Sequence, residues 1–200
     1  MNEIGLFFGT FNPIHVGHLI IADFVAQSAG LREVRLVVTP QNPHKHKSTL
    51  LADHHRLEMV HLAVEGNPRL RAEDVEFRLP KPSYTVDTLA YLAEKYPDRK
   101  FVLIMGEDNL RTLHKWKNYQ VICEHHKILV YPRLDPTSQD AEPPAAMGEV
   151  NADIIRLDAP HMQISSSFVR RAIADGLDVR YILTEPVYRY IKDMNFYRRK

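Results

Sequence analysis

The 200 residues lack several features that would place a protein in a special class. Cys123 is the single cysteine, so no disulfide can form within the chain, and a reducing compartment is expected. No apolar run approaches the ~20 residues that cross a bilayer, and Glu3 stands where a signal peptide would carry basic residues. The formal net charge of +1 gives no general attraction for nucleic acid or an anionic membrane. We therefore expect a cytoplasmic protein with neither a nucleic-acid nor a membrane partner.

Internal repeats, low-complexity blocks and long linkers are also missing, as are the phosphate-binding patterns GxxxxGK[ST] and GxGxxG. The hydrophobic fraction of 44% and the charged fraction of 26% are ordinary for a globular protein. A chain of this length can bury a sizeable core. We predict one domain over residues 1–200, with a proline-rich surface excursion at 133–150 and a C-terminal helical segment at 177–194.

Strand-like and helix-like stretches alternate along the chain. The apolar runs 4–8 and 34–38 enclose a helical stretch at 15–29, which predicts a parallel strand pair with a right-handed crossover. Further strands are predicted at 70–77, 100–105, 126–131 and 152–157, and further helices at 51–65, 85–96, 110–116, 118–124 and 168–174. Ser83 or Thr85 is the expected cap of the helix at 85–96, and the basic end at 196–200 is expected to fray. The alternation predicts an α/β fold, a Rossmann-like doubly wound parallel sheet with helices on both faces.

A polar turn follows the first strand and leads into the first helix. Gly9, Thr10 and Phe11 begin this turn, and His15 and His18 open the helix. The unpaired N–H groups and the dipole of a helix N-terminus favour an anion. Histidines three residues apart share one side of the first turn and can donate to phosphate oxygens, more strongly when protonated. We predict a nucleotide phosphate site at this turn.

Two other interpretations of these histidines stay open. His15 could cap the helix while His18 packs against the sheet. The pair could also bind zinc with His44 or His46, although no cysteine joins the cluster.

Near the end of the chain, the stretch ISSSFVR at 164–170 again places polar donors at a predicted helix N-terminus. Ser165 and Ser167 stand at a predicted helix start, and Arg170 returns to the same side of the helix three residues later. A plain serine cap is the structural alternative. Polar clusters also follow the second and fourth predicted strands, at 40–47 and 106–116. Because ligands of open parallel sheets bind beyond the carboxyl ends of the strands, we expect these clusters to converge.

Two segments together resemble a known superfamily. GTFNPIHVGH at 9–18 and ISSSFVR at 164–170 are similar to the HxGH and ISSxxxR signatures of the nucleotidyltransferases. PSYTVDTL at 82–89 and GED at 106–108, followed by Trp116, resemble the bacterial nicotinate-nucleotide adenylyltransferases in particular. The likeness runs from residue 4 to about residue 190.

The chain departs from the family pattern at two positions and in one longer stretch. Phe8 stands where Gly is frequent in the family, and Asn12 stands where Asp is frequent. Neither position needs to touch phosphate, so the activity is not put in doubt. The excursion at 133–150 is not accounted for by the signatures.

The resemblance implies adenylyl transfer from ATP to nicotinic acid mononucleotide, giving nicotinic acid adenine dinucleotide and pyrophosphate, a step of NAD biosynthesis. The acceptor phosphate is already an anion and attacks the α-phosphorus directly, so neither a covalent intermediate nor a general base is expected. Magnesium is implied with ATP, carried mainly by pyrophosphate oxygens, and no metal-binding residues of the protein are expected.

The resemblance also implies roles for individual residues. Catalysis falls to His15, His18 and Arg170. The implied ATP-binding residues are Gly9, Thr10, Phe11, His15, His18, Gly106, Asp108, Ile164, Ser165, Ser167 and Arg170. Among them, Gly106 and Asp108 hold a ribose. The implied mononucleotide-binding residues are Asn42, His44, Lys45, Tyr84, Thr85 and Trp116. Trp116 would stack on the nicotinate ring, for which core packing is the alternative, and Tyr84 with Thr85 would meet the carboxylate.

Three other functions remain as alternatives. A phosphopantetheine adenylyltransferase shares the chemistry but is usually shorter, and PSYT and the tryptophan are not expected in it. An enzyme preferring nicotinamide mononucleotide differs only by an amide in place of a carboxylate. A non-catalytic nucleotide-binding module would not need His15, His18, Ser165 and Arg170 together. The sequence leaves the oligomeric state open, a homodimer included.

Overall fold

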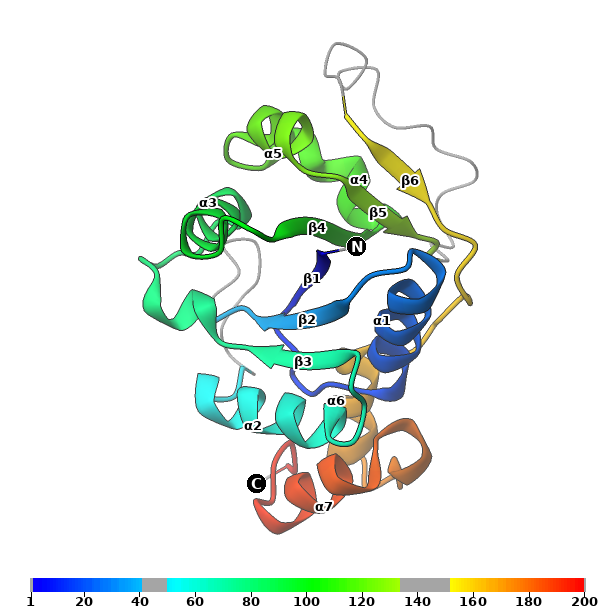
Figure 1. Ribbon diagram of the computed structural model, residues 1–200. Coiled ribbons are helices and arrows are strands. Elements are labelled where there is room, and N and C mark those ends of the chain that lie inside the picture. Colours follow the sequence, from blue (N-terminus) through cyan, green and yellow to red (C-terminus); the bar gives the residue numbers. More distant parts are fainter. Residues whose placement is uncertain (1, 41–49, 134–151, 200) are drawn as a thin grey trace.

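A computed structural model describes residues 2–40, 50–133 and 152–199, and its strands form a single parallel sheet. The strands are β1 (Glu3–Gly9), β2 (Glu33–Val38), β3 (Leu70–Glu73), β4 (Lys100–Gly106), β5 (Ile128–Tyr131) and β6 (Ile154–Arg156). Their order is β3-β2-β1-β4-β5-β6, and every neighbouring pair is parallel (Figure 1). This is the doubly wound order, in which the direction of winding reverses between β1 and β4. The predicted fold class is confirmed.

Helices cover both faces of this sheet. They are α1 (Val16–Ser28), α2 (Asp53–Val64), α3 (Thr85–Lys95), α4 (Glu107–Thr112), α5 (Tyr119–His125), α6 (Ser166–Ala174) and α7 (Glu185–Asp193). One hydrophobic cluster joins the sheet to α1, α2, α6 and α7, and the other joins it to α3, α4 and α5 (Figure 1). None of the helices described here is long and apolar enough to cross a membrane.

The alternation of side chains along β1 explains why both faces are covered. Ile4 and Leu6 point into the cluster under α3, and Phe7 points into the cluster under α1. Strands buried on both faces read as continuous apolar runs rather than as alternating ones. The run from Ile4 to Phe8 therefore belongs to a central strand, with β2 on one side and β4 on the other.

Some predicted boundaries were wrong. The strand expected at 70–77 ends at Glu73, and the 3-10 helix η1 (Val75–Arg78) follows it. The helix expected from 168 begins at Ser166, within the serine run. Neither Ser83 nor Thr85 caps α3, because the N-cap position is Tyr84 and no side chain bonds there.

The C-terminal segment at 177–194 is helical. A 3-10 helix, η4 (Arg180–Ile182), is followed by α7, and Pro186 lies in the first turn of α7, where its missing N–H costs nothing. Beyond α7 the aromatic ring of Phe196 packs against the core, and the last described residues lie beside α2 and α7 (Figure 1). The fraying expected at 196–200 is wrong for Phe196 and Tyr197, because their partly buried rings pack against the core.

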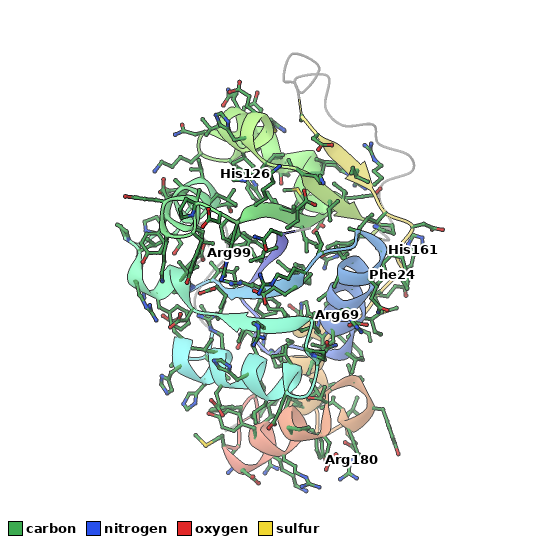
Figure 2. All side chains as sticks on the ribbon, viewed as in Figure 1. Phe24, Arg69, Arg99, His126, His161 and Arg180 are labelled. Atoms are coloured by element: carbon green, nitrogen blue, oxygen red, sulfur yellow. The ribbon has the colours of Figure 1, made fainter. Side chains whose placement is uncertain are left out.

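Polar contacts away from the carboxyl ends of the strands fasten the helices to the sheet. Arg69, which precedes β3 (Figure 2), pairs with Asp23 of α1 at 3.2 Å. His126, labelled in the same view, ends α5 and lies with its Nδ1 3.1 Å from the carbonyl oxygen of Phe101. Some of the abundant histidines are therefore structural.

Candidate active site

A cavity of about 580 Å³ opens at the carboxyl ends of β1 and β4, where the strand order reverses. Its size is typical of a site for a small ligand. The predicted site residues that line it are Gly9, Thr10, Phe11, His15, His18, Tyr84, Thr85, Asp108, Trp116, Ile164, Ser165, Ser167 and Arg170. Gly106 lies directly beside Asp108. Asn42, His44 and Lys45, like most of the excursion at 133–150, lie outside the described residues.

The two histidines of the first turn are stacked on each other. Their ring centroids are 3.7 Å apart and their planes are inclined by 23°. The backbone N–H of His15 donates to Nδ1 of His18 over 3.3 Å, so the neutral His18 ring carries its proton on Nε2. His18 therefore has a defined tautomer, and His15 and His18 both border the cavity.

His15 is neutral at physiological pH. Its side chain is buried, and Nδ1 has no hydrogen-bond partner. Burial, aided by the positive charge of Arg133, lowers the pKa of His15 from 6.5 to about 4. Without ligand, His15 is therefore an uncharged imidazole, and the stronger protonated donor considered from the sequence does not form here.

Aromatic packing and small residues hold the turn in shape. Phe11 has a left-handed backbone, with φ of 44°, and its ring packs edge-on against His18 at 5.1 Å between centroids. A Cβ at Gly9 would lie 2.9 Å from the Phe11 ring, and a Cβ at Gly17 would lie 3.1 Å from Nδ1 of His15. Both glycines leave room for the rings that shape the site.

The start of α6 is fastened directly to the turn after β1. Ser166 donates from its hydroxyl to the carbonyl oxygen of Pro13 over 2.9 Å. Arg170 donates to the carbonyl oxygen of Asn12 over 2.7 Å and to the hydroxyl of Ser167 over 3.2 Å. The two signature segments, remote in sequence, thus form one wall of the cavity.

Ser165 acts as the helix cap of α6, since its hydroxyl accepts from the N–H of Phe168 over 3.2 Å. The structural alternative considered for the serines therefore holds for Ser165. Ser166, which the sequence analysis did not select, makes the contact to the turn. Because Ser166 stands between two other serines, the sequence could not show which of the three hydroxyls contacts the turn.

Arg56 of α2 holds the loops after β1 and β2, and sequence reasoning missed it. The side chain is fully buried. Its guanidinium donates to the carbonyl oxygens of Thr10 at 2.6 Å, Thr39 at 2.8 Å and Pro40 at 3.2 Å. It also pairs with Asp53 at 2.6 Å. In sequence, Arg56 is one of several charged residues mixed with apolar ones on a predicted helix, so its burial could not be foreseen.

The opposite wall of the cavity is built around the start of α3. No side chain caps α3, so no side-chain acceptor occupies its first N–H groups. The buried hydroxyl of Ser83 has no hydrogen-bond partner. Lys117 lies over the ring of Tyr84, 4.8 Å from its centroid. Trp116 is half-buried, packing partly on the core while it lines the cavity.

Glu76 adjoins this wall as a buried carboxyl group. The side chain of Thr88 donates to its Oε1 over 2.9 Å, and burial raises the pKa of Glu76. Because η1 replaces the predicted strand here, the sequence pattern did not place Glu76 at the cavity.

Asp108 and Arg133 form an ion pair at the ends of β4 and β5. Arg133 Nη1 lies 3.0 Å from Asp108 Oδ2, while Oδ1 is buried without a hydrogen-bond partner. Tyr131 lies behind them, and burial raises its pKa to about 12. Arg133 adds a positive charge to the cavity that the sequence analysis did not foresee, since it lies at the edge of the excursion.

The zinc interpretation finds no support among the residues that the structure describes. There, no group of three or more His, Cys, Asp or Glu side chains could hold a metal ion. His44 and His46, which that interpretation requires, lie outside the described residues.

Comparison with known proteins adds to this geometry. A family model described as cytidylyltransferase-like matches residues 6–172. A protein of Christiangramia forsetii, named probable nicotinate-nucleotide adenylyltransferase, is 53% identical over 98% of both chains. A protein of the same name from Flavobacterium johnsoniae is 51% identical over 98% of this chain and 100% of its own. The chain belongs to the nicotinate-nucleotide adenylyltransferase family.

Solved structures agree with this family fold. The nicotinic acid mononucleotide adenylyltransferase of Plasmodium falciparum, complexed with NaAD, matches with a TM-score of 0.79 over 98% of both chains. Its sequence is only 18% identical, so this likeness shows the fold alone. The overall fold of the two chains is thus similar at low sequence identity.

Proposed function

We propose that this protein transfers the adenylyl group of ATP to nicotinic acid mononucleotide and releases pyrophosphate, a step of NAD biosynthesis. The two relatives reported above are named for this activity, and their similarity to this chain extends over nearly their full length. The Plasmodium falciparum neighbour was solved with NaAD, and a second structure of that protein was solved with APC. Nucleotides are therefore the ligands that we assign to the cavity.

One observation carries this proposal most strongly. The turn with His15 and His18 and the helix start with Arg170 are joined by two hydrogen bonds at the mouth of a single cavity. Donors of both segments therefore converge on one place. A triphosphate presents several anionic oxygens, and helix N-termini with charge-assisted donors are suited to bind them.

The donor set suggests how the reaction is accelerated. We assign His15, His18 and Arg170 to the phosphates of ATP, where they stabilise the charge that develops on the transferring group. The acceptor phosphate is an anion at neutral pH and needs no general base. Because His15 is neutral, its imidazole is suited to donate a hydrogen bond rather than to shuttle protons. This agrees with catalysis by positioning and charge stabilisation.

We assign the ribose of ATP to Gly106 and Asp108, whose unpartnered Oδ1 can accept from a ribose hydroxyl. The acceptor belongs at the opposite wall. Trp116 offers an aromatic face for the nicotinate ring, and the uncapped start of α3 at Tyr84 and Thr85 offers N–H groups for its carboxylate.

Nucleotidyl transfer generally employs a divalent metal ion with ATP. We propose Mg²⁺ for this chain. The cavity donors named above are histidines, serines and an arginine, which are ligands for anions rather than for a hard cation. This donor set fits a cation that is coordinated mainly by phosphate oxygens. The cytoplasm, expected from the single cysteine, stays a prediction.

A pyrophosphate-release assay tests the proposal. Purified protein is incubated with ATP, Mg²⁺ and one of three acceptors: nicotinic acid mononucleotide, nicotinamide mononucleotide or phosphopantetheine. We expect the highest kcat/KM with nicotinic acid mononucleotide. Preference for either other acceptor would reassign the substrate, and no release with any of them would refute the proposal.

A further inference from the structure

The C-terminal end of the chain returns to the phosphate-binding turn. After α7, Asn195 and Tyr197 both adopt left-handed backbone conformations, with φ of 54° and 63°. The N–H of Phe196 donates to the carbonyl oxygen of Ile191 over 3.0 Å, which closes this reversal. The reversal brings the hydroxyl of Tyr197 to 2.8 Å from Oδ1 of Asn12.

Asn12 is the residue through which this contact reaches the site. Its side chain is buried, and Oδ1 accepts from the hydroxyl of Tyr197 and, over 3.3 Å, from the N–H of Leu51. Its backbone carbonyl oxygen accepts from Arg170 over 2.7 Å. Asn12 therefore connects the C-terminal end and the segment before α2 to the arginine of the second signature.

Tyr197 itself stands behind the site. It packs among the core residues, and it is not one of the residues that line the cavity. Burial raises the pKa of Tyr197, so the hydroxyl keeps its proton and remains a donor at neutral pH. Tyr197 therefore reaches the site from behind, by its hydrogen bond to Asn12, with Arg170 and Arg56 as the charged neighbours of its hydroxyl.

We propose that Tyr197 is a positioning residue for adenylyl transfer: its hydroxyl fixes Asn12, and Asn12 fixes Arg170 against the phosphates. This inference rests on the proposed function. A displacement of about 1 Å can cost a large part of the rate when the chemistry depends on alignment. The left-handed residues at 195 and 197 are the backbone feature that delivers the hydroxyl.

The test compares Tyr197→Phe with the matched variant Tyr190→Phe. The hydroxyl of Tyr190 lies 2.9 Å from Nδ1 of His55, so this control also removes one hydroxyl from a C-terminal tyrosine bonded to another element. We expect Tyr197→Phe to lower kcat about tenfold, with KM for the mononucleotide changed less than about twofold. Tyr190→Phe should leave both constants within about twofold.

Two further variants separate positioning from general stability. Asn12→Leu removes the oxygen that accepts from Tyr197 and should lose kcat as Tyr197→Phe does. Adding Tyr197→Phe to Asn12→Leu should then cause no further loss, because the contact is already absent.

The outcomes are distinguishable. If wild-type protein releases no pyrophosphate, the proposed function fails. If wild-type protein is active and Tyr197→Phe matches Tyr190→Phe in kcat, the positioning role alone is overturned. Additive losses in the double variant would also overturn it, whatever the melting temperatures of the single variants are.

Discussion

The backbone N–H of His15 donates to the ring of His18, and the two rings stack with their centroids 3.7 Å apart. This relationship settles the orientation of His18. Its Nδ1 is engaged by the backbone, so Nε2 carries the proton of the neutral ring and can donate to a ligand. The first turn of α1 therefore presents a fixed donor at the cavity rather than a freely rotating imidazole.

Replacement of His18 tests that donor. We expect His18→Ala to lower kcat by at least ~10²-fold, the scale of removing one preorganised donor from a developing charge. His61→Ala, at an exposed position on α2, serves as the control and should keep wild-type rates. Steady-state pyrophosphate release measures both variants. Near-normal turnover of His18→Ala would contradict the assigned role.

The depressed pKa of His15 predicts how stability depends on pH. The pKa is about 4 in the folded protein against 6.5 for an ordinary histidine. The unfolded chain thus takes up the proton first, and the free energy of unfolding falls as pH drops from 6.5 towards 4. The slope from this group is at most ~1.4 kcal/mol per pH unit, and its total is on the order of 3 kcal/mol. Above pH 6.5 the contribution is constant.

Urea unfolding of wild type and His15→Gln at several pH values measures this term. Glutamine does not titrate, and the other shifted groups are common to both proteins, so the difference between the two curves isolates His15. We expect the stability advantage of wild type to shrink between pH 6.5 and 4. Parallel curves over that range would refute the buried neutral state of His15.

The fold could be predicted because its signal is repeated along the chain. The buried strand of residues 4–8 and the helix after it follow from apolar pattern alone, and the strand–helix alternation limits the sheet to few topologies. Segment 70–77 shows the limit of that method. Its apolar pattern suits a strand, but pairing with β2 ends at Glu73, and local turning then forms η1. The end of β3 is therefore set by its pairing with β2 and not by the local sequence pattern.

The site could be predicted where its residues form contiguous motifs, as at 9–18 and 164–170. The supporting residues could not, because each is a single side chain that becomes important only through contacts with remote segments. Arg56 gathers carbonyl oxygens from two loops. Tyr197 lies in a basic C-terminal stretch whose composition predicts fraying. Its hydroxyl nevertheless donates a hydrogen bond to Asn12, 185 residues away in the sequence. No pattern in one sequence encodes such a contact.

The place of Trp116 at the cavity predicts a selective effect on the acceptor. We expect Trp116→Ala to raise KM for the mononucleotide about tenfold or more, since an aromatic stacking contact with a base contributes ~1–3 kcal/mol. KM for ATP should change much less. Trp116→Phe keeps an aromatic face and should restore most of the affinity. Equal increases in both KM values for Trp116→Ala would refute the stacking role.

The burial of Arg56 predicts a large loss of stability when its charge network is broken. Arg56→Met keeps much of the side-chain volume but leaves the carbonyl oxygens of Thr10, Thr39 and Pro40 without their donor. Breaking a buried charge network commonly costs 3–5 kcal/mol, and we expect a cost of about 3 kcal/mol in urea unfolding. Arg71→Met is the control: Arg71 is 62% exposed, and its partner Glu33 keeps a second ion pair with Arg35 at 2.8 Å. Such a surface pair is worth at most ~1 kcal/mol. A cost for Arg56→Met no larger than for Arg71→Met would show that the loops of the site do not depend on Arg56.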